Sequence, residues 1–471
     1  MPSLPFTTWN PTAMPRSPIA LGLIALLLFA AARLPAAPPS AAARQAGDAV
    51  LALVAEGDAD MQAVALERVR DGDSLAGAWF TTEAAARLAG LSPDRQARLL
   101  VALADRGDPA ALPAVRPLAV AADERVKLAA IALLGRLGEP ADVPLLVEAV
   151  SQDGAVAAAA RRGLIEIRAS DAVRAAASAA APATQAVLFD ILADRRDRQA
   201  LPLLAAAADG DPAGRAAAMR ALARFGTARE LDAMVRSFLQ ATGGERKAAE
   251  TAIVAVCTTG SDAPAAAATL VAGYGRLDPA LQEQLLPVLA RVGGPGVMAI
   301  VDGMVAEPAT RRQGLEALAR WPDASVTERI LAVHAATADP VEKQLMLNAL
   351  IRIAPLPDNR LDDAGRLALL EQTFALCDRP EDRGRVIERA NAIRTYEAFR
   401  FVAGFLDDPA LAEAACLSIV ELAHHRKLRD AHKPEFMAAL DRVLATSQNP
   451  ELIERATRYK AGQTWDRKRK S

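Results

Sequence analysis

The sequence predicts an all-α protein, a right-handed α-solenoid of about a dozen stacked helix pairs. Two observations predict this fold. The first is a unit with the pattern of a helix, a tight turn and a second helix, which is clearest from Asp123 to Val150. The second is the recurrence of this unit about every 28 to 40 residues, a spacing typical of helical-pair arrays.

The unit is amphipathic in both of its helices. Apolar residues share one face of the first helix, at Val126, Ala130, Leu134 and Leu137. Gly138 is placed to end this helix and Pro140 to begin the next one. Leu145, Leu146 and Val150 form the apolar stripe of the second helix. Because neither helix can bury its stripe alone, copies of the unit must stack on one another.

The position of Leu134 has an equivalent in every copy of the unit, and we call it the anchor position. The anchor positions hold Leu103, Leu134, Leu164, Leu192, Leu222, Ile253, Leu289, Leu318, Leu350, Ala390, Ile419 and Ala456. A chain of 471 residues is too long for one ordinary core. A solenoid escapes this limit because each repeat contacts only its neighbours.

This pattern resembles the HEAT-repeat family, in particular the phycobilisome-lyase-type repeats of exported bacterial HEAT-repeat domain-containing proteins. The resemblance spans about Asp48 to Lys460. It is carried by Val126, Lys127, Ala130, Leu134, Gly135, Leu137 and Gly138, and again by Arg215, Ala218, Leu222, Phe225 and Gly226. The resemblance implies that the helices beginning at Glu124, Gly214 and Thr310 line the concave side. These motif residues serve packing, so the resemblance implies a fold rather than one function.

The N-terminal region has the layout of a secretory signal peptide followed by a linker, over residues 1–43. Arg16 precedes an apolar run of fourteen residues, 19–32, and small residues follow it. Cleavage after Ala36 or Ala43 fits this pattern, and translation can begin at Met1 or Met14. We therefore expect an exported, periplasmic or secreted protein. The alternative is an uncleaved membrane helix, although the run is shorter than the roughly 17–25 residues of a membrane span.

The rest of the chain divides by the regularity of its repeats. We predict capping helices at 44–93, HEAT-like repeats at 94–354, an inserted loop at 355–366, further repeats with a cap at 367–460, and a basic tail at 461–471. The inserted loop is either part of a binding face or a tolerated surface loop. The aromatic helix at Thr395–Leu406 is either core or an exposed partner site.

The sequence favours no catalytic or metal chemistry. A net charge of −2 does not indicate nucleic-acid binding. Phosphate-binding GxxxxGK[ST], nucleophile GxSxG and zinc-binding HExxH motifs are absent. His424, His425 and His432 are poorly spaced for one metal ion, and we expect no cofactor. The acidic pairs 362–363 and 381–382 stand at helix starts, where negative charge favours the helix dipole.

Three widely spaced cysteines, Cys257, Cys377 and Cys416, do not form a disulfide framework. We expect small buried thiols. An intermolecular bridge is the alternative.

The sequence thus predicts a non-enzymatic scaffold in the cell envelope that binds a protein or peptide along the solenoid groove. The candidate binding residues are cations of the presumed inner helices: Lys127, Arg161, Arg162, Arg215, Arg220, Arg224, Arg311 and Arg312. Solvated helix faces are the simpler explanation of these charges. The basic C-terminal end is a second candidate, for an anionic envelope polymer.

Two alternative functions remain open. The family resemblance also implies HEAT-fold enzymes, either bilin-lyase-like or DNA-alkylation-repair-like. The segment Arg458–Trp465 resembles the end of arrays in secreted proteins, which implies an accessory module of a sugar-active or redox enzyme.

Overall fold

The computed structural model describes residues 39–71, 75, 77–357 and 360–465. Within these ranges the elements are helices, joined by short turns. The all-α prediction is therefore confirmed. None of the helices in this part of the chain is both long enough and apolar enough to span a membrane. The predicted signal peptide lies outside the described residues except at 39–43, where the first described helix begins. Residues 466–471 of the predicted basic tail also lie outside them.

The chain divides into two compact units, Met1–Arg195 and Arg196–Ser471. The described helices of the first unit are α2 (Ala41–Glu56), α3 (Ala59–Arg70), α4 (Ala78–Ala86), η1 (Arg87–Gly90), α5 (Pro93–Arg106), η2 (Pro109–Ala111), α6 (Leu112–Val115), η3 (Arg116–Val120), α7 (Glu124–Leu137), η4 (Pro140–Asp142), α8 (Val143–Val150), α9 (Gly154–Glu166), α10 (Ser170–Ala179) and α11 (Pro182–Asp194).

The helices of the second unit continue the same alternation. They are η5 (Arg198–Ala200), α12 (Leu201–Ala208), α13 (Pro212–Phe225), η6 (Ala228–Glu230), α14 (Leu231–Gln240), α15 (Gly243–Thr258), α16 (Ala263–Tyr274), α17 (Pro279–Val292), α18 (Pro295–Ala306), α19 (Arg311–Ala319), η7 (Ala324–Val326), α20 (Thr327–Ala336), α21 (Pro340–Ile353), α22 (Asp363–Ala375), α23 (Pro380–Ala390), α24 (Tyr396–Ala403), α25 (Ala412–His424), α26 (Arg426–Ala431), α27 (Lys433–Thr446) and α28 (Pro450–Lys460).

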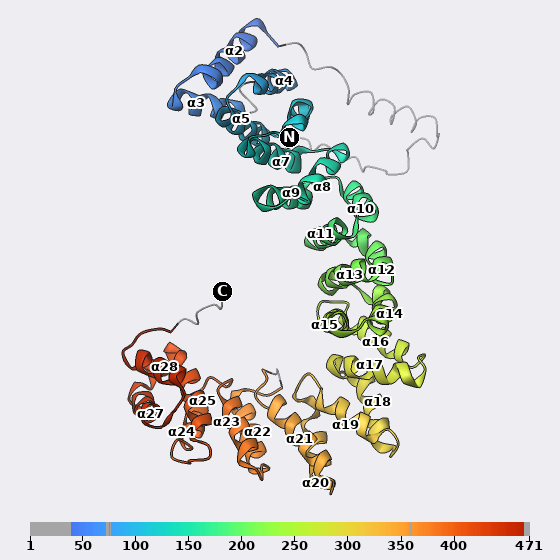
Figure 1. Ribbon diagram of the computed structural model, residues 1–471, viewed down its shortest axis with the longest axis vertical. Helices are drawn as coiled ribbons and strands as arrows, with labels where there is room; N and C mark the ends of the chain where they lie inside the picture. Colours follow the sequence, from blue (N-terminus) through green and yellow to red (C-terminus); the bar gives the residue numbers. More distant parts are fainter. Residues whose placement is uncertain (1–38, 72–74, 76, 358–359, 466–471) are drawn as a thin grey trace, which may run out of the picture. The chain divides into compact units, whose positions relative to one another are not determined.

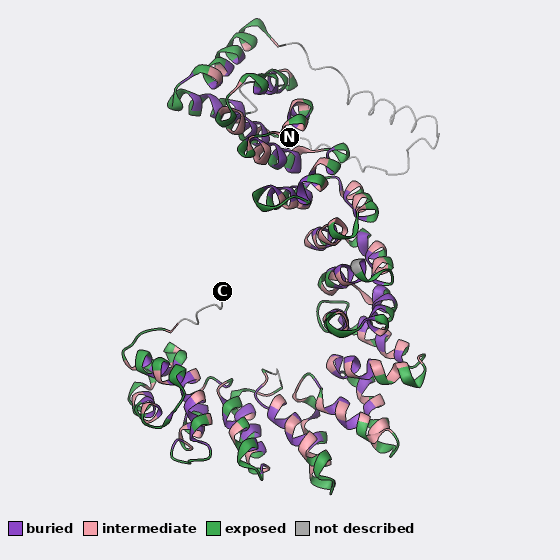
Figure 2. Ribbon diagram, viewed as in Figure 1, coloured by how far each residue is buried: buried purple, intermediate pink, exposed green. Residues whose placement is uncertain are grey.

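Each predicted anchor position lies on a different helix, and every anchor side chain is buried. We call these the anchor helices and the helices that precede them the facing helices. In the first unit the anchor helices α5, α7, α9 and α11 contact one another in sequence. In the second unit the contacts run through α13, α15, α17, α19, α21, α23, α25 and α28. Figure 1 shows α13 and α15 in one row, with α12 and α14 in the other. The buried residues in Figure 2 lie where neighbouring helices meet.

The two helices of the predicted repeat unit, α7 and α8, are not the two that pack most extensively on each other. Helix α8 packs more extensively on α9, the first helix of the next unit, than on α7. A periodic array has no intrinsic starting point, so the sequence pattern cannot tell which neighbouring helices form a pair. Helices α8, α12, α14, α18 and α20 likewise pack most extensively on the anchor helix that follows them, whereas α16 packs more on α15, the anchor helix before it.

The helix boundaries follow local capping chemistry. The side chain of Asp123 accepts hydrogen bonds from the backbone N–H groups of Arg125 and Val126, at the start of α7. Asp362 caps α22 in the same way, through the N–H of Gly365 at 2.8 Å. Gly293 follows the last residue of α17 with φ +70°, a left-handed conformation that favours glycine.

Two interruptions of the pattern also have a structural explanation. The predicted loop at 355–366 covers the connection between α21 and α22, of which 358–359 lie outside the described residues, and the first residues of α22. In the aromatic segment, Phe399 of α24 is buried and stacks on Phe436 of α27, with ring centroids 4.1 Å apart. Phe401 and Phe405 contact Phe374 of α22. These rings pack between neighbouring repeats, in agreement with the core interpretation.

Candidate functional site

All eight candidate cations lie on anchor helices. Lys127 is on α7, and Arg161 and Arg162 are on α9. The other five are on two helices of the second unit: Arg215, Arg220 and Arg224 on α13, and Arg311 and Arg312 on α19. The structure therefore places these charges in one row within each unit, but it assigns them different environments.

Three of the eight cations link consecutive repeats. Arg161 forms an ion pair with Asp194 at the end of α11, at 2.5 Å. Arg215 is buried and donates to the carbonyl of Gly210 and to the side chain of Gln240 on α14.

Arg311 makes the third link. It binds both carboxylate oxygens of Glu342 on α21, at 3.0 Å each. Sequence spacing alone could not separate these linking residues from charges that face solvent.

The other five cations are more accessible. Arg162, Arg220 and Arg224 are exposed, and Lys127 is half-buried. Arg312 is exposed and forms an ion pair with Glu316 one turn along α19, at 3.1 Å. Such surface pairs contribute about 0–1 kcal/mol, so Arg312 remains available to a partner.

A second set of arginines joins the repeats, and the sequence interpretation missed it. Arg106 donates to the carbonyl of Val69 near the end of α3. Arg195 donates to three carbonyls at the end of α9, including that of Ile167. Arg352 donates to the carbonyl of Ala319 at the end of α19. Helix C-terminal carbonyls lack intrahelical partners and attract cations. The signal was present in the sequence, because each arginine stands two or three residues after an anchor position.

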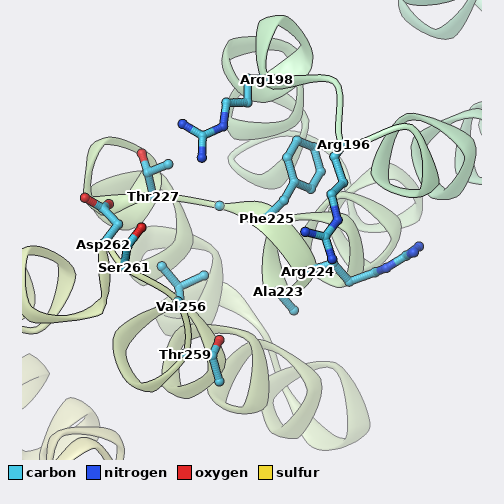
Figure 3. Close-up of a pocket in the computed structure, with 12 residues that line it drawn as sticks. Arg196, Arg198, Ala223, Arg224, Phe225, Thr227, Val256, Thr259, Ser261 and Asp262 are labelled. Carbon is cyan, nitrogen blue, oxygen red and sulfur yellow. The ribbon is translucent and has the colours of Figure 1, made fainter.

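The second unit also contains a polar cavity of about 390 Å³, which we call the arginine cavity. It lies where the turns after α13 and α15 meet the start of η5 (Figure 3). Its cationic lining residues are Arg196, Arg198 and Arg224, and its hydroxyl-bearing residues are Thr227, Thr259 and Ser261. Phe225 and Val256 contribute apolar surface. Of the eight predicted cations, only Arg224 is among these lining residues.

Local hydrogen bonds hold the turns that carry Thr227 and Asp262 in this cavity. Thr227 and Glu230 form a capping box at the start of η6. Asp262, the one carboxylate among the lining residues, accepts a hydrogen bond from the N–H of Ala228 at 2.7 Å. The turn that carries Asp262 begins at Gly260, whose φ of +84° requires a residue that adopts the left-handed region easily.

Arg196 has an unusual backbone conformation. Among the described residues it is the one residue other than glycine with a positive φ, at +50°. The turn after α5 uses Gly107 in the left-handed region, with φ +78°. A left-handed conformation costs a residue with a Cβ atom about 1–2 kcal/mol. The structure thus keeps a strained arginine at the edge of the cavity.

The arrangement suits anion binding. The lining residues include no histidine or cysteine, so the cavity offers no side chain that ordinarily titrates near neutral pH. Guanidinium groups bind planar oxyanions through paired hydrogen bonds. Three arginines and one aspartate are among the lining residues, so the lining carries an excess of positive charge.

The basic C-terminal end forms a second polar cavity, of about 440 Å³. Its charged lining residues are Arg426, Arg429, Asp430, Lys433 and Lys460. Several of these charges already have partners. Arg426 pairs with Asp430 at 3.2 Å, and Lys460 pairs with Asp441. Arg429 is buried and donates to the carbonyl of Ala423. The binding of an anionic polymer here stays a prediction.

Two of the clustered histidines contact aromatic rings, and the cysteines are buried. His424 hydrogen-bonds to the hydroxyl of Tyr459 at 2.9 Å, and His432 stacks on Tyr396. In the described part of the chain, no three His, Cys, Asp or Glu side chains are grouped as metal ligands. Cys257, Cys377 and Cys416 are all buried, as expected. Burial raises the pKa of the Cys257 thiol to about 12.

Comparison with known proteins supports the repeat assignment. The family model described as HEAT repeats matches residues 82–165. No curated protein matches the chain. Karyopherin Kap121p bound to the extreme C-terminus of the protein phosphatase Cdc14p is similar at 10% identity and a TM-score of 0.42, over 87% of this chain and 53% of that chain. Yeast importin-beta, Kap95p, is similar at 11% identity and a TM-score of 0.38, over 89% and 66% of the two chains.

The chain spans about half the length of Kap121p. Residues 82–165 thus match the HEAT-repeat family model, in a chain whose described part is an all-α array of helix pairs.

Proposed function

We propose that this protein is a non-enzymatic scaffold of the cell envelope that binds a protein or peptide along its anchor helices. The supporting observation is the placement of all eight candidate cations on these helices. Three of the eight cations link repeats, and the other five are the more accessible ones. HEAT-repeat arrays commonly act as binding scaffolds because stacking gives them a long continuous surface. The signal-like sequence at residues 1–43 supports export.

The binding proposal is tested by affinity capture with the immobilised full chain, from envelope and cytosolic extracts of the source cell. The expected result is one stoichiometric partner from the envelope fraction. Its retention should fall as salt rises, because exposed charge contacts are screened within about 8 Å at physiological ionic strength. A partner recovered equally from both extracts, or retained equally at high salt, would contradict the proposal.

A matched pair of variants sharpens this test. The double variant Arg220→Glu and Arg312→Glu reverses two exposed charges on anchor helices. The control, Arg329→Glu and Arg400→Glu, reverses the charges of two exposed arginines on the facing helices α20 and α24. Only the first variant should lose the partner. Equal loss in both would show that net charge, not the anchor row, governs capture. Melting curves recorded beside the capture identify any unfolded variant.

A further inference from the structure

We propose that the arginine cavity binds the carboxylate groups of an acidic peptide segment in the scaffold's partner. This inference rests on the proposed scaffold function and names the chemistry that the partner presents. Four features of the cavity support it: its charge, the freedom of two of its cations, the backbone of Arg196, and the mixture of polar and apolar lining.

The charge balance of the cavity is unusual for this chain. The whole sequence has a net charge of −2, whereas three arginines and one aspartate line the cavity. One oxygen of that aspartate, Asp262, already accepts the N–H of Ala228. The positive charge of the lining arginines is therefore poorly neutralised by the cavity's own groups, and an anionic ligand would neutralise it.

Two of the three cations are available to a ligand. In the part of the chain that the structure describes, the guanidinium groups of Arg196 and Arg198 have neither a hydrogen bond nor an ion pair. Both residues are exposed. Arg224 already has an interaction partner, so it contributes only background positive charge.

The backbone of Arg196 points to a role beyond the turn itself. Glycine would adopt φ +50° without strain, as it does at comparable angles in other turns of this chain. An arginine here costs stability and brings a cation to the cavity edge. Strained residues of this kind concentrate at ligand-binding positions because the surrounding structure holds them in place.

The spread of the lining groups favours a peptide over a small anion. In Figure 3, Arg198 lies on the side of Thr227 and Asp262, whereas Arg196 lies beyond the ring of Phe225. Two separated guanidinium groups suit two carboxylates better than one compact ion. Phe225 and Val256 add apolar surface for a side chain between them. The cavity volume of about 390 Å³ admits such a short segment.

The test measures fluorescence anisotropy of the full chain with a labelled peptide of sequence Glu-Glu-Phe-Glu-Glu. The matched probe has glutamine in place of every glutamate. The acidic probe should bind at least tenfold more tightly. Equal affinity for the two probes would overturn the proposal. Inorganic phosphate is added as a competitor, and displacement by phosphate at equal concentration would show a free-anion site instead of a peptide site.

Two variants assign the binding to the cavity. Arg196→Gly and Arg198→Glu should each weaken the acidic probe by five- to tenfold or more. Arg394→Glu makes the same charge change at an exposed position outside the cavity and should leave binding unchanged. Equal weakening by Arg394→Glu would overturn the assignment. Arg196→Gly should melt at the same or a higher temperature than the natural chain, because glycine relieves the strained backbone, so lost binding cannot come from unfolding.

The same variants separate this inference from the scaffold function. A chain with Arg196→Gly and Arg198→Glu that still captures the natural partner at full strength refutes the cavity assignment and leaves the scaffold intact. Peptide binding at the cavity without any captured partner refutes the scaffold and leaves an anion site.

Discussion

At the scale of single residues, burial between repeats decides which side chains matter. Leu134 of α7 is fully buried, and so are the anchors on either side of it. Gly135, next to it, approaches α9 so closely that a Cβ atom would lie 2.3 Å from the Cα of Gly163. The motif that the sequence repeats is therefore a packing motif. Its large residues fill the space between helices, and its small ones let the helices approach.

We expect Leu134→Ala to lower the free energy of unfolding by about 2–5 kcal/mol, because it opens a cavity between stacked anchor helices. Denaturant titration followed by circular dichroism measures this change. Val341→Ala is the control, since Val341 is 70% exposed and its truncation should cost less than about 0.5 kcal/mol. Similar losses in the two variants would contradict an inter-repeat core at Leu134.

The pair of Arg311 and Glu342 predicts a pH-dependent stability. Hydrogen bonds from Arg311 and then from Thr337 hold the pKa of Glu342 below its ordinary value. A lowered folded pKa gives stabilisation that is complete above the unfolded value, about 4.3. This stabilisation disappears as the pH falls through the folded pKa.

Glu342→Gln should therefore lower the melting temperature at pH 7, and the difference from the natural chain should shrink as the pH falls below about 4. Thermal melts across this range measure it. A difference that stays constant with pH would show that the charge of Glu342 makes no contribution.

At the scale of the helix, stability depends on how each anchor helix ends. The carbonyls at the C-terminus of one helix accept hydrogen bonds from an arginine of the next anchor helix, as Arg352 shows for α19. Apolar packing brings the helices together, and these hydrogen bonds satisfy the helix ends at the junction. A mutation at such an arginine should therefore act on two helices at once.

Arg352→Ala should lower the free energy of unfolding by about 1.5–3 kcal/mol, the range for hydrogen bonds that involve a charged group. Its side chain donates to the carbonyls of Ala319 and Trp321, at 2.9 and 2.5 Å. Arg320→Ala is the matched control, because exposed Arg320 donates to the carbonyl of Glu316 within its own helical segment. Equal effects of the two changes would refute a linking role for Arg352.

At the scale of the whole molecule, the two compact units predict staged unfolding. Each repeat contacts mainly its neighbours, so a local loss of stability need not spread along the chain. Calorimetry should show more than one transition. Leu134→Ala in the first unit and Leu350→Ala in the second should shift different transitions. A single sharp transition that both variants shift equally would show strong coupling between the repeats.

The cysteines provide an independent probe of the second unit, which contains all three. Burial raises the pKa of Cys377 and Cys416 to about 11 each, and their thiols are inaccessible in the folded chain. Iodoacetamide labelling during heating should therefore follow only the transition that Leu350→Ala shifts. Labelling that follows the other transition would contradict the assignment of transitions to units.

The sequence by itself determined the helices, their caps and the buried anchor positions. These features depend on residues at most one or two turns apart, as for Asp123 at the start of α7 or Leu134 on its buried face. Periodicity and capping act locally, so they can be recognised without knowing the fold. The sequence also predicted which helices carry the candidate cations.

Only the tertiary structure decided which helices pair and which charges remain accessible. Arg161 and Arg311 meet acidic partners about thirty residues away, and no local pattern shows that these cations link repeats. The arginine cavity is assembled from three separate chain segments, at 196–198, 223–227 and 256–262. Its shape depends on how successive helices stack and on the left-handed backbone of Arg196. Contacts between distant residues and turn conformations are set by packing, which a one-dimensional pattern does not specify.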